Sequence, residues 1–172
     1  GTVEALDKIG EGSKGVIIFH SLSKRSSAAG LRAGFIAGDK EVISKYRQLT
    51  SNGGVAISEP QLRVAQALYN DDKHVEQIRN FYDVNFQLSE KILNSKKPQG
   101  GFFNFIPVND DLIATKHLWE NHGVKVMPGR FMAHTDNDIN PGRNYLRIAL
   151  VNNETITKRG LQKISKGLQE LQ

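Results

Sequence analysis

Short apolar runs alternate with amphipathic stretches along this 172-residue chain, and the two kinds of segment predict strands and helices. Five runs rich in β-branched and aromatic residues predict strands. These runs are residues 16–20, 33–38, 102–108, 124–127 and 145–151. The last of them has the clearest pattern, because Arg147 is the one charged residue in an otherwise apolar run.

Between these runs, apolar residues spaced three or four apart predict helices whose first turns are marked by capping residues. The expected helices run from Asp39 to about Leu49, from Ser58 to about Tyr69, from Asp71 to about Ile92, from Asp110 or Asp111 to Gly123, and onward from Asn153. The last helix is expected to turn its apolar side inward, through Ile156, Leu161, Ile164, Leu168 and Leu171.

The change of rhythm near residue 70 predicts two domains. Residues 1–70 contain two strands that have the composition of buried strands in a parallel sheet. Two such strands cannot cover their own faces and edges, so this part is expected to be the end of a larger α/β sheet. Residues 71–172 are expected to form a small α+β domain, with the long helix after Asp71 as a bridge.

Composition narrows the classes of protein that fit. The net charge is +5, but residues 1–70 contain 9 Lys/Arg against 6 Asp/Glu and residues 71–172 contain 14 against 12. Nucleic-acid binders gather their charge on one face or stripe, so a basic nucleic-acid-binding module is the weaker alternative. No run approaches the roughly 20 apolar residues that span a bilayer. The absence of cysteine excludes disulfides and thiolate metal sites and fits a cytoplasmic protein.

One short segment contains residues suited to a specific chemistry. Ser21 precedes Lys24 by three residues, and Arg32 follows Lys24 by eight. Lysine amines form Schiff bases with carbonyl cofactors, of which pyridoxal phosphate (PLP) is the common one. An isolated lysine is usually a solvated surface residue. Here Ser21, Lys24 and Arg32 together supply the amine and the anion-binding groups that a phosphorylated aldehyde requires.

The segment Ser21–Gly34 resembles the cofactor-lysine segment of class I/II PLP-dependent aminotransferases of fold type I. Four later segments follow in the order that the family has. They are Asp71-Asp72-Lys73-His74, Pro98-Gln99-Gly100-Gly101-Phe102-Phe103, Val126-Met127-Pro128-Gly129 and Asn144-Tyr145-Leu146-Arg147-Ile148-Ala149. The resemblance covers essentially the whole chain. It implies the end of a large PLP-binding domain with a mainly parallel sheet, followed by a small α+β domain.

The resemblance also implies roles for single residues. Lys24 would link to pyridoxal 5'-phosphate and serve as acid and base, while Ser21, Ser23 and Arg32 would bind the cofactor's phosphate. Arg147 would bind the substrate α-carboxylate. The partners implied are a small amino acid and a 2-oxo acid such as 2-oxoglutarate, and a second copy of the chain in a homodimer.

Within the family, residues 20–27 (His20-Ser21-Leu22-Ser23-Lys24-Arg25-Ser26-Ser27) are most similar to the N-succinyldiaminopimelate aminotransferases, which implies N-succinyl-diaminopimelate as amino donor and a place in lysine biosynthesis. Another class I/II aminotransferase with a different amino-acid specificity is the alternative. Pocket side chains, more than the fold, set such specificity.

One departure from the family bears on activity. Family members have an Asp-Glu-x-Tyr segment before the cofactor lysine, whose aspartate pairs with the pyridine nitrogen and whose tyrosine contacts the cofactor oxygen. Residues 1–23 contain no such segment, and Asp7 has no tyrosine after it. Since the chain also begins with Gly1, it resembles the C-terminal portion of an aminotransferase. An inactive truncated fragment that acts only as a folded domain is therefore a second hypothesis.

The histidines show no metal-ligand spacing, so no metal site is expected. They are His20, His74, His117, His122 and His134. His117 and His122 lie five residues apart on a predicted helix, a spacing that does not place two side chains well on one face.

Overall fold

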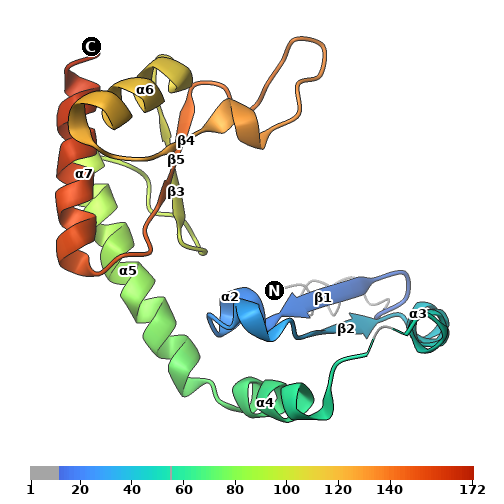
Figure 1. Ribbon diagram of the computed structural model, residues 1–172. Helices are drawn as coiled ribbons and strands as arrows, with labels where there is room; N and C mark the ends of the chain where they lie inside the picture. The colour runs from blue at the N-terminus through green and yellow to red at the C-terminus, as the bar shows by residue number, and fades with distance from the viewer. Residues whose placement is uncertain (1–11, 55) are drawn as a thin grey trace. The chain divides into compact units, whose positions relative to one another are not determined.

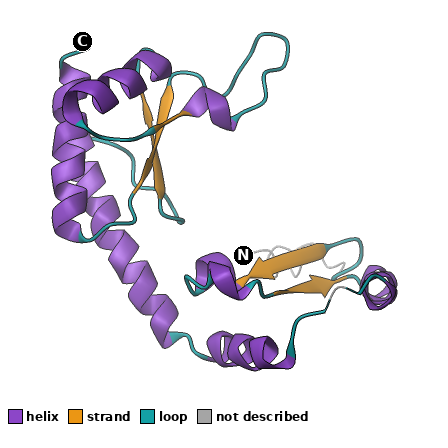
Figure 2. Cartoon of the chain, viewed as in Figure 1, coloured by secondary structure: helices purple, strands orange, loops and turns teal. Residues whose placement is uncertain are grey.

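The computed structural model describes residues 12–54 and 56–172, so Asp7 lies outside the described residues. The chain divides into two compact units, residues 1–77 and 78–172. Figure 1 labels their helices and strands in chain order, and Figure 2 distinguishes the helices in purple from the strands in orange. Within the described residues, no helix is both long and apolar enough to cross a membrane.

The first unit contains a pair of strands and the helices that follow it. Strand β1 (Ile17–Ser21) pairs with β2 (Gly34–Gly38), so that Ile17 lies opposite Gly38 and Ser21 opposite Gly34. Between the strands lie the one-turn helix α2 (Leu22–Arg25) and a 3-10 turn. Helices α3 (Lys40–Asn52) and α4 (Glu59–Asn70) come after β2.

The expectation of parallel strands in this unit is wrong for the pair of β1 and β2. The two strands are antiparallel, and the Phe19 side chain of β1 is 74% exposed. Their connection holds only two short helical turns, whereas parallel neighbours require a crossover, usually a full helix. Apolar composition predicted that strands form here but not the direction in which they run.

The second unit is a three-stranded antiparallel sheet with helices on one face. Strand β5 (Tyr145–Ala149) lies between β3 (Phe103–Pro107) and β4 (Met127–Pro128). Helices α5 (Lys73–Leu93), α6 (Asp111–His122) and α7 (Glu154–Gln169) complete the element order, and α5 begins in the first unit. Leu146 and Ile148 of β5 are buried in one core with Leu118 and Leu161.

The capping residues predicted from sequence are confirmed. Asp39 accepts hydrogen bonds from two backbone N–H groups at the start of α3, and Ser58 forms a capping box with Gln61 at the start of α4. Asp110 and Asn153 cap α6 and α7 in the same way. Local side-chain chemistry therefore determines where these helices begin.

Two predictions in the second unit need correction. Residues 124–126 are not in the sheet, because Val124 N donates to the Leu118 carbonyl as α6 ends and only Met127 and Pro128 pair with β5. Ile156 is 44% exposed instead of inward-facing, and the neighbouring Thr157 is the buried residue. Leu161 and Ile164 are buried as expected, and Leu168 and Leu171 pack against the same core.

Two glycines of α7 test how closely this helix packs. A Cβ added at Gly160 would meet nothing within 4 Å, whereas one at Gly167 would lie 2.7 Å from Leu118 Cδ2 and from His122 Cδ2. Replacing Gly160 with alanine is expected to raise the free energy of unfolding by about 0.5–1 kcal/mol, because glycine weakens a helix interior.

Gly167→Ala is the matched comparison and is expected to lower the free energy of unfolding, because overpacking costs roughly 1–3 kcal/mol and outweighs the gain in helix propensity. Urea unfolding followed by circular dichroism measures both effects. Equal stabilisation by the two substitutions would contradict close packing of α6 on α7.

Candidate functional site

The predicted cofactor lysine lies on α2, the single helical turn after β1. Ser21 caps this turn: its Oγ accepts a hydrogen bond from Ser23 N at 3.1 Å and donates one to Ser23 Oγ at 3.0 Å. Leu22 is fully buried against Ala33 and Ala65, while Lys24 is exposed. The burial of Leu22 therefore orients α2 so that Lys24 lies on its outer side.

Arg32 lies at the end of the 3-10 turn over Ala29–Leu31. Its backbone is in the left-handed region, with φ 52° and ψ 35°, which is uncommon for a residue other than glycine. Its Nη1 donates to the Ala29 carbonyl at 3.1 Å, and its side chain is exposed. Such a conformation is maintained only where the surrounding structure determines it.

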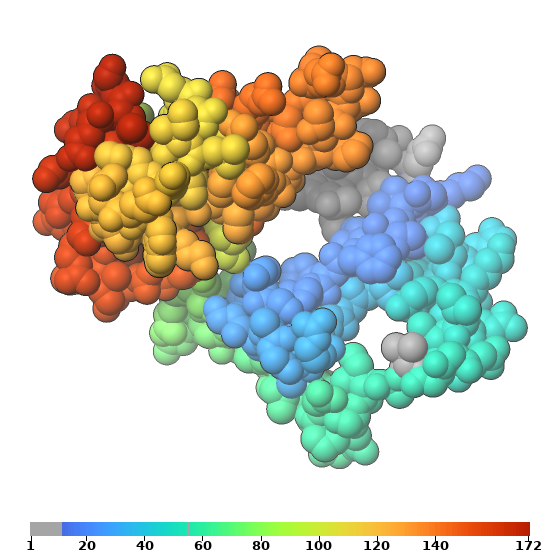
Figure 3. Space-filling view, turned by 45° about the horizontal axis from the view of Figure 1, so that its top comes forward, coloured from blue at the N-terminus to red at the C-terminus, as the bar shows by residue number. Residues whose placement is uncertain are grey.

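The strand register brings the predicted cofactor residues to one end of the β1–β2 pair. Ser21 lies opposite Gly34, and Leu22 N donates to the Ala33 carbonyl at 3.1 Å, so the start of α2 lies beside the residue that follows Arg32. The approach of the strands is close: a Cβ at Gly34 would lie 2.4 Å from the His20 carbonyl oxygen. In the space-filling view the segment of residues 17–35 (blue) lies at the surface (Figure 3).

The groups at this end of the strand pair are donors and cations. Residues 21–34 include Lys24, Arg25 and Arg32 and no carboxylate. An open hollow reaches Ser21 and is otherwise lined by residues such as Phe19, Phe35 and Ile57, and Lys24 and Arg32 are not among its lining residues. The donor set suits an anion together with a carbonyl group.

Arg25 is a structural residue that sequence reasoning did not identify. Its Nη1 donates to the Leu68 carbonyl at 2.6 Å, and its Nη2 lies 2.5 Å from Asp72 Oδ1. The guanidinium is also 5.5 Å from the centre of the Tyr69 ring, and the side chain is only 15% exposed. Arg25 therefore holds α2 to the end of α4. The sequence offered one signal for this contact: an arginine follows the lysine directly, and the acidic pair Asp71-Asp72 could supply its partner.

Ser26 makes a second connection from the lysine segment. Its Oγ lies 2.9 Å from His74 Nε2, and His74 Nδ1 lies 2.9 Å from Asp71 Oδ2. Arg25 and Ser26, on which the narrower resemblance depended, thus make contacts inside the first unit. These contacts fix the position of α2, and they involve residues more than 40 positions away in the sequence.

Arg147 lies on the sheet face opposite the core. Its neighbours Leu146 and Ile148 are buried, so the alternation of a strand turns Arg147 to the other side. Its guanidinium lies over the Phe103 ring, 4.3 Å from the ring centre, and its partners across the strands are Phe105 and Met127. Among the described residues, no carboxylate forms an ion pair with Arg147.

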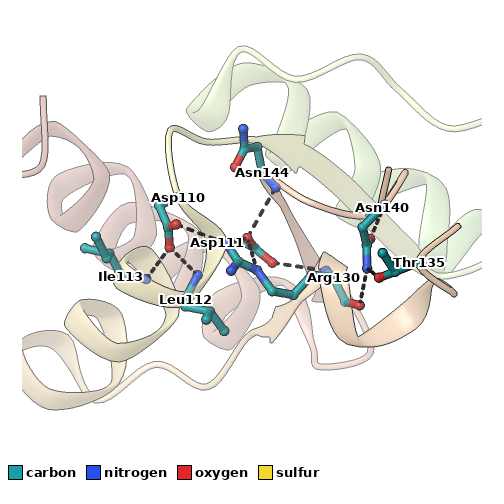
Figure 4. A network of polar contacts seen from close by, with 9 residues as sticks. Asp110, Asp111, Leu112, Ile113, Arg130, Thr135, Asn140 and Asn144 are labelled. Carbon is teal, nitrogen blue, oxygen red and sulfur yellow. Dashed lines mark hydrogen bonds and ion pairs between the residues drawn. The ribbon is translucent and has the colours of Figure 1, made fainter. Parts of the chain in front are cut away.

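A buried ion pair between Asp111 and Arg130 fixes the loop that precedes β5 (Figure 4). Asp111 is fully buried and accepts hydrogen bonds from Arg130 Nε at 2.8 Å, Arg130 Nη2 at 2.5 Å and Arg130 N at 3.0 Å. Asn144 N donates to it at 3.2 Å. Arg130 Nη2 also lies 3.0 Å from Asp110 Oδ2. The sequence left open whether Asp110 or Asp111 starts the helix; Asp110 is the cap, and Asp111 forms the buried pair.

Burial raises the pKa of the Asp111 carboxyl, but the hydrogen bonds from Arg130 and Asn144 outweigh burial and lower that pKa to about 2. Asn140 extends the network, since its Nδ2 donates to the Arg130 carbonyl and to Thr135 Oγ1, both at 3.0 Å. The network thus connects the start of α6, the Pro128-Gly129 turn and Asn144, which precedes β5.

The expectation that His117 and His122 do not share a face is wrong. Their Nε2 atoms lie 3.0 Å and 2.8 Å from the same oxygen, Oε2 of Glu170. The helix α6 ends at His122, and Glu170 follows α7, so the meeting point depends on two helix ends. No local pattern in the sequence could have shown it.

Comparisons with known proteins match most of the chain. The model of the family described as aminotransferase class I and II matches residues 2–164. A crystal structure of an aminotransferase from Neisseria meningitidis, 33% identical in sequence, matches with a TM-score of 0.94 and covers 98% of this chain and 44% of that one.

Two curated relatives have named activities. The chain is 30% identical over 140 residues to 4-dedimethylamino-4-oxo-anhydrotetracycline transaminase OxyQ of Streptomyces rimosus, covering 78% of this chain and 37% of OxyQ. It is 31% identical over 164 residues to LL-diaminopimelate aminotransferase of Natranaerobius thermophilus, covering 89% and 41%. The chain thus spans about two fifths of the length of the relatives it matches.

The lowered pKa of Asp111 predicts that the protein loses stability in acid. A carboxyl whose pKa falls on folding stabilises the fold fully above its unfolded pKa of 3.8, and that stabilisation is lost as the pH falls towards about 2. The loss attributable to Asp111 is about 2 kcal/mol. Asp111→Asn is expected to be less stable than the wild type at pH 7, and the difference is expected to shrink between pH 4 and pH 2.

Urea unfolding at several pH values between 2 and 7 measures this difference. Asp136→Asn, in the exposed loop, serves as the matched control and should track the wild type at every pH. A constant difference between Asp111→Asn and the wild type over the acid range would contradict the assignment of the shift to Asp111.

Proposed function

The chain belongs to the class I and II aminotransferases, and on this basis we propose that it is the portion of a PLP-dependent aminotransferase that includes the cofactor lysine and the small domain. Members of this family depend on PLP, and its solved members have fold type I. The single observation that supports the role of this chain best is the arrangement of Ser21, Lys24 and Arg32 at one end of the β1–β2 pair.

The donor set at that end fits the proposed cofactor. When bound, PLP supplies an aldehyde that links to an amine and a ring that withdraws electrons from the substrate Cα. Lys24 Nζ is the amine proposed to make the link and, once the substrate amine has displaced it, to hold and move the proton of the substrate Cα. Arg32 is proposed to bind the phosphate by charge-assisted hydrogen bonds, with Ser21 and Ser23 as hydroxyl donors.

Arg147 is proposed to bind the substrate α-carboxylate. Its planar guanidinium can make two parallel hydrogen bonds to a carboxylate, and the Phe103 ring beneath it restricts its orientation. Its partners across the strands, Phe105 and Met127, are apolar, so no neighbouring charge on these strands competes for the guanidinium.

For the substrates, the proposed amino donor is a diaminopimelate-type amino acid, first of all N-succinyl-diaminopimelate, and the acceptor is a 2-oxo acid such as 2-oxoglutarate. The likeness of residues 20–27 to the N-succinyldiaminopimelate enzymes and the LL-diaminopimelate aminotransferase among the relatives support this choice. Arg25 and Ser26 make internal contacts, so that likeness supports the family more strongly than the donor.

The remaining parts of the proposal concern the whole protein. Residues 1–70 are proposed to be the end of the large domain and residues 71–172 the small domain, with further walls of the pocket supplied by other sequence or by a second copy in a homodimer. A second candidate, a folded domain without activity, has one observation in its favour. Among the described residues of the first unit, the buried apolar cluster consists of Leu22, Ala33 and Ala65, whereas the second unit has an extensive core.

Lys24→Ala tests the first candidate in the complete protein. When the complete protein is incubated with PLP, the visible absorbance of the lysine-bound cofactor is expected to develop in the wild type and to be lost in Lys24→Ala. Lys40→Ala, which removes an exposed lysine at the start of α3, is the matched control and should retain it. A complete protein that never develops this absorbance, or one in which Lys24→Ala keeps it, would rule out the proposal.

Arg147→Gln tests the substrate role separately. In the complete protein it is expected to lower kcat/KM by roughly 10²–10³-fold, because one partner of a charged hydrogen-bonded pair is removed, while cofactor absorbance stays unchanged. Arg143→Gln, an exposed arginine in the preceding loop, should leave kcat/KM within about twofold if only Arg147 binds the carboxylate. Similar losses in both variants would show that Arg147 has no specific role.

A further inference from the structure

The meeting of His117, His122 and Glu170 has no role in the proposed transamination. His117 and His122 lie in α6 and Glu170 follows α7, and none of the three lies among the residues proposed to bind cofactor or substrate. We propose that these three side chains form a site for a divalent transition-metal ion, with Zn²⁺ as the preferred ion.

The ligand atoms converge on one point. Oε2 of Glu170 is 3.0 Å from His117 Nε2 and 2.8 Å from His122 Nε2, and the three ligand atoms all lie within 4.8 Å of one another. The two rings are tilted by 56° with centres 5.3 Å apart. Zinc binds nitrogen and carboxylate oxygen at about 2.0–2.2 Å, so small outward shifts of these atoms open a position equally close to all three.

The three side chains of the cluster differ in exposure in a way that suits a bound ion. The side chain of His122 is 9% exposed and that of His117 is 20% exposed, while Glu170 is 41% exposed. Two ligands are thus held by packing, and the third lies on the side that faces water. A solvent molecule can complete a four-coordinate arrangement from that side, as in zinc sites with three protein ligands.

The position of His122 depends on the absence of a side chain at Gly167 in α7. Gly167 lies beneath its ring, and a Cβ there would be 3.0 Å from His122 Nε2 and 2.7 Å from His122 Cδ2. Glycine weakens a helix interior, yet α7 has it at the point where the imidazole rests. Lys163 Nζ donates to the His122 carbonyl at 2.9 Å and holds the same residue through its backbone.

The charges and hydrogen bonds of the cluster are compatible with a cation. Glu170 supplies a carboxylate oxygen, a ligand type that zinc binds together with imidazole nitrogen. Metal binding requires an unprotonated Nε2 on each ring, which moves the proton of a neutral imidazole to Nδ1. For His117, the Asn121 amide lies 2.9 Å from Nδ1, and its oxygen can accept that proton's hydrogen bond once the amide is turned.

The ligand types indicate which ions bind. Two imidazoles and one carboxylate suit Zn²⁺, and also Cu²⁺ and Ni²⁺, whereas Mg²⁺ and Ca²⁺ prefer sites made of oxygen. Because two ligands come from α6 and the third from the C-terminal end of α7, a bound ion would cross-link the two helices. The expected consequence is greater thermal stability of the second unit, since an ion that binds only the folded state stabilises it.

Cobalt titration tests the site directly. The full chain, made without a histidine tag and stripped with a chelator, is titrated with Co²⁺, which reports four-coordinate geometry through its visible d–d bands. One equivalent is expected to produce these bands, and Zn²⁺ is expected to abolish them. His117→Ala and Glu170→Gln should each weaken Co²⁺ binding at least about tenfold, since even loss of an outer contact such as that of Asn121 costs about 10–100-fold.

His134→Ala is the matched control, because it removes an exposed histidine from the same unit and should leave binding unchanged. Zn²⁺ should also raise the unfolding temperature of the wild type and of His134→Ala, but not that of Glu170→Gln, which is nearly isosteric and exposed enough to preserve the fold. Absence of the bands, or equal Co²⁺ affinities in the wild type and Glu170→Gln, would reduce the cluster to ordinary hydrogen bonds. Neither result bears on the role of Lys24.

Discussion

The ion pair between Asp111 and Arg130 is the contact on which the geometry of the second unit depends. A buried carboxylate is costly unless each of its lone pairs finds a donor. Asp111 meets this requirement with the Arg130 side chain, the Arg130 N–H and the Asn144 N–H. Because these donors belong to two separate parts of the loop between α6 and β5, residues 130 and 144, satisfying one side chain ties both parts to the start of α6.

That constraint explains why an irregular stretch can precede a well-placed strand. Residues 129–144 contain a short helical turn and an exposed loop, with no long element to hold them. Asn144 is nevertheless fixed by Asp111, and three residues later Arg147 lies over Phe103 with its neighbours in the core. The orientation of the guanidinium is therefore set by the protein's own contacts, which is the condition for the specific recognition proposed for Arg147.

Local signals predicted the helices well, and contacts distant in sequence account for what sequence reasoning missed. A cap such as Asp39 or Ser58 acts within three residues of itself, so its chemistry can be read from the chain. The direction of β2 relative to β1 depends on how the connection packs, and apolar composition does not encode that direction. The same distinction holds for the candidate site. The spacing of Ser21, Lys24 and Arg32 is local and can be read from the sequence, while the partners of Arg25 lie more than 40 residues away and cannot.

The exposure of Lys24 is best understood together with the contacts beneath it. Leu22 is fully buried, Arg25 donates to the end of α4, and Ser26 bonds His74, so the residues on both sides of the lysine are held. The backbone that bears the amine is thus fixed even though the amine itself lies at the surface. A lysine that must meet a cofactor in one orientation gains from such support, because less conformational entropy is lost when the cofactor binds. For the role proposed for Lys24, the flanking residues therefore supply the positioning, and a motif of isolated reactive groups would not have revealed them.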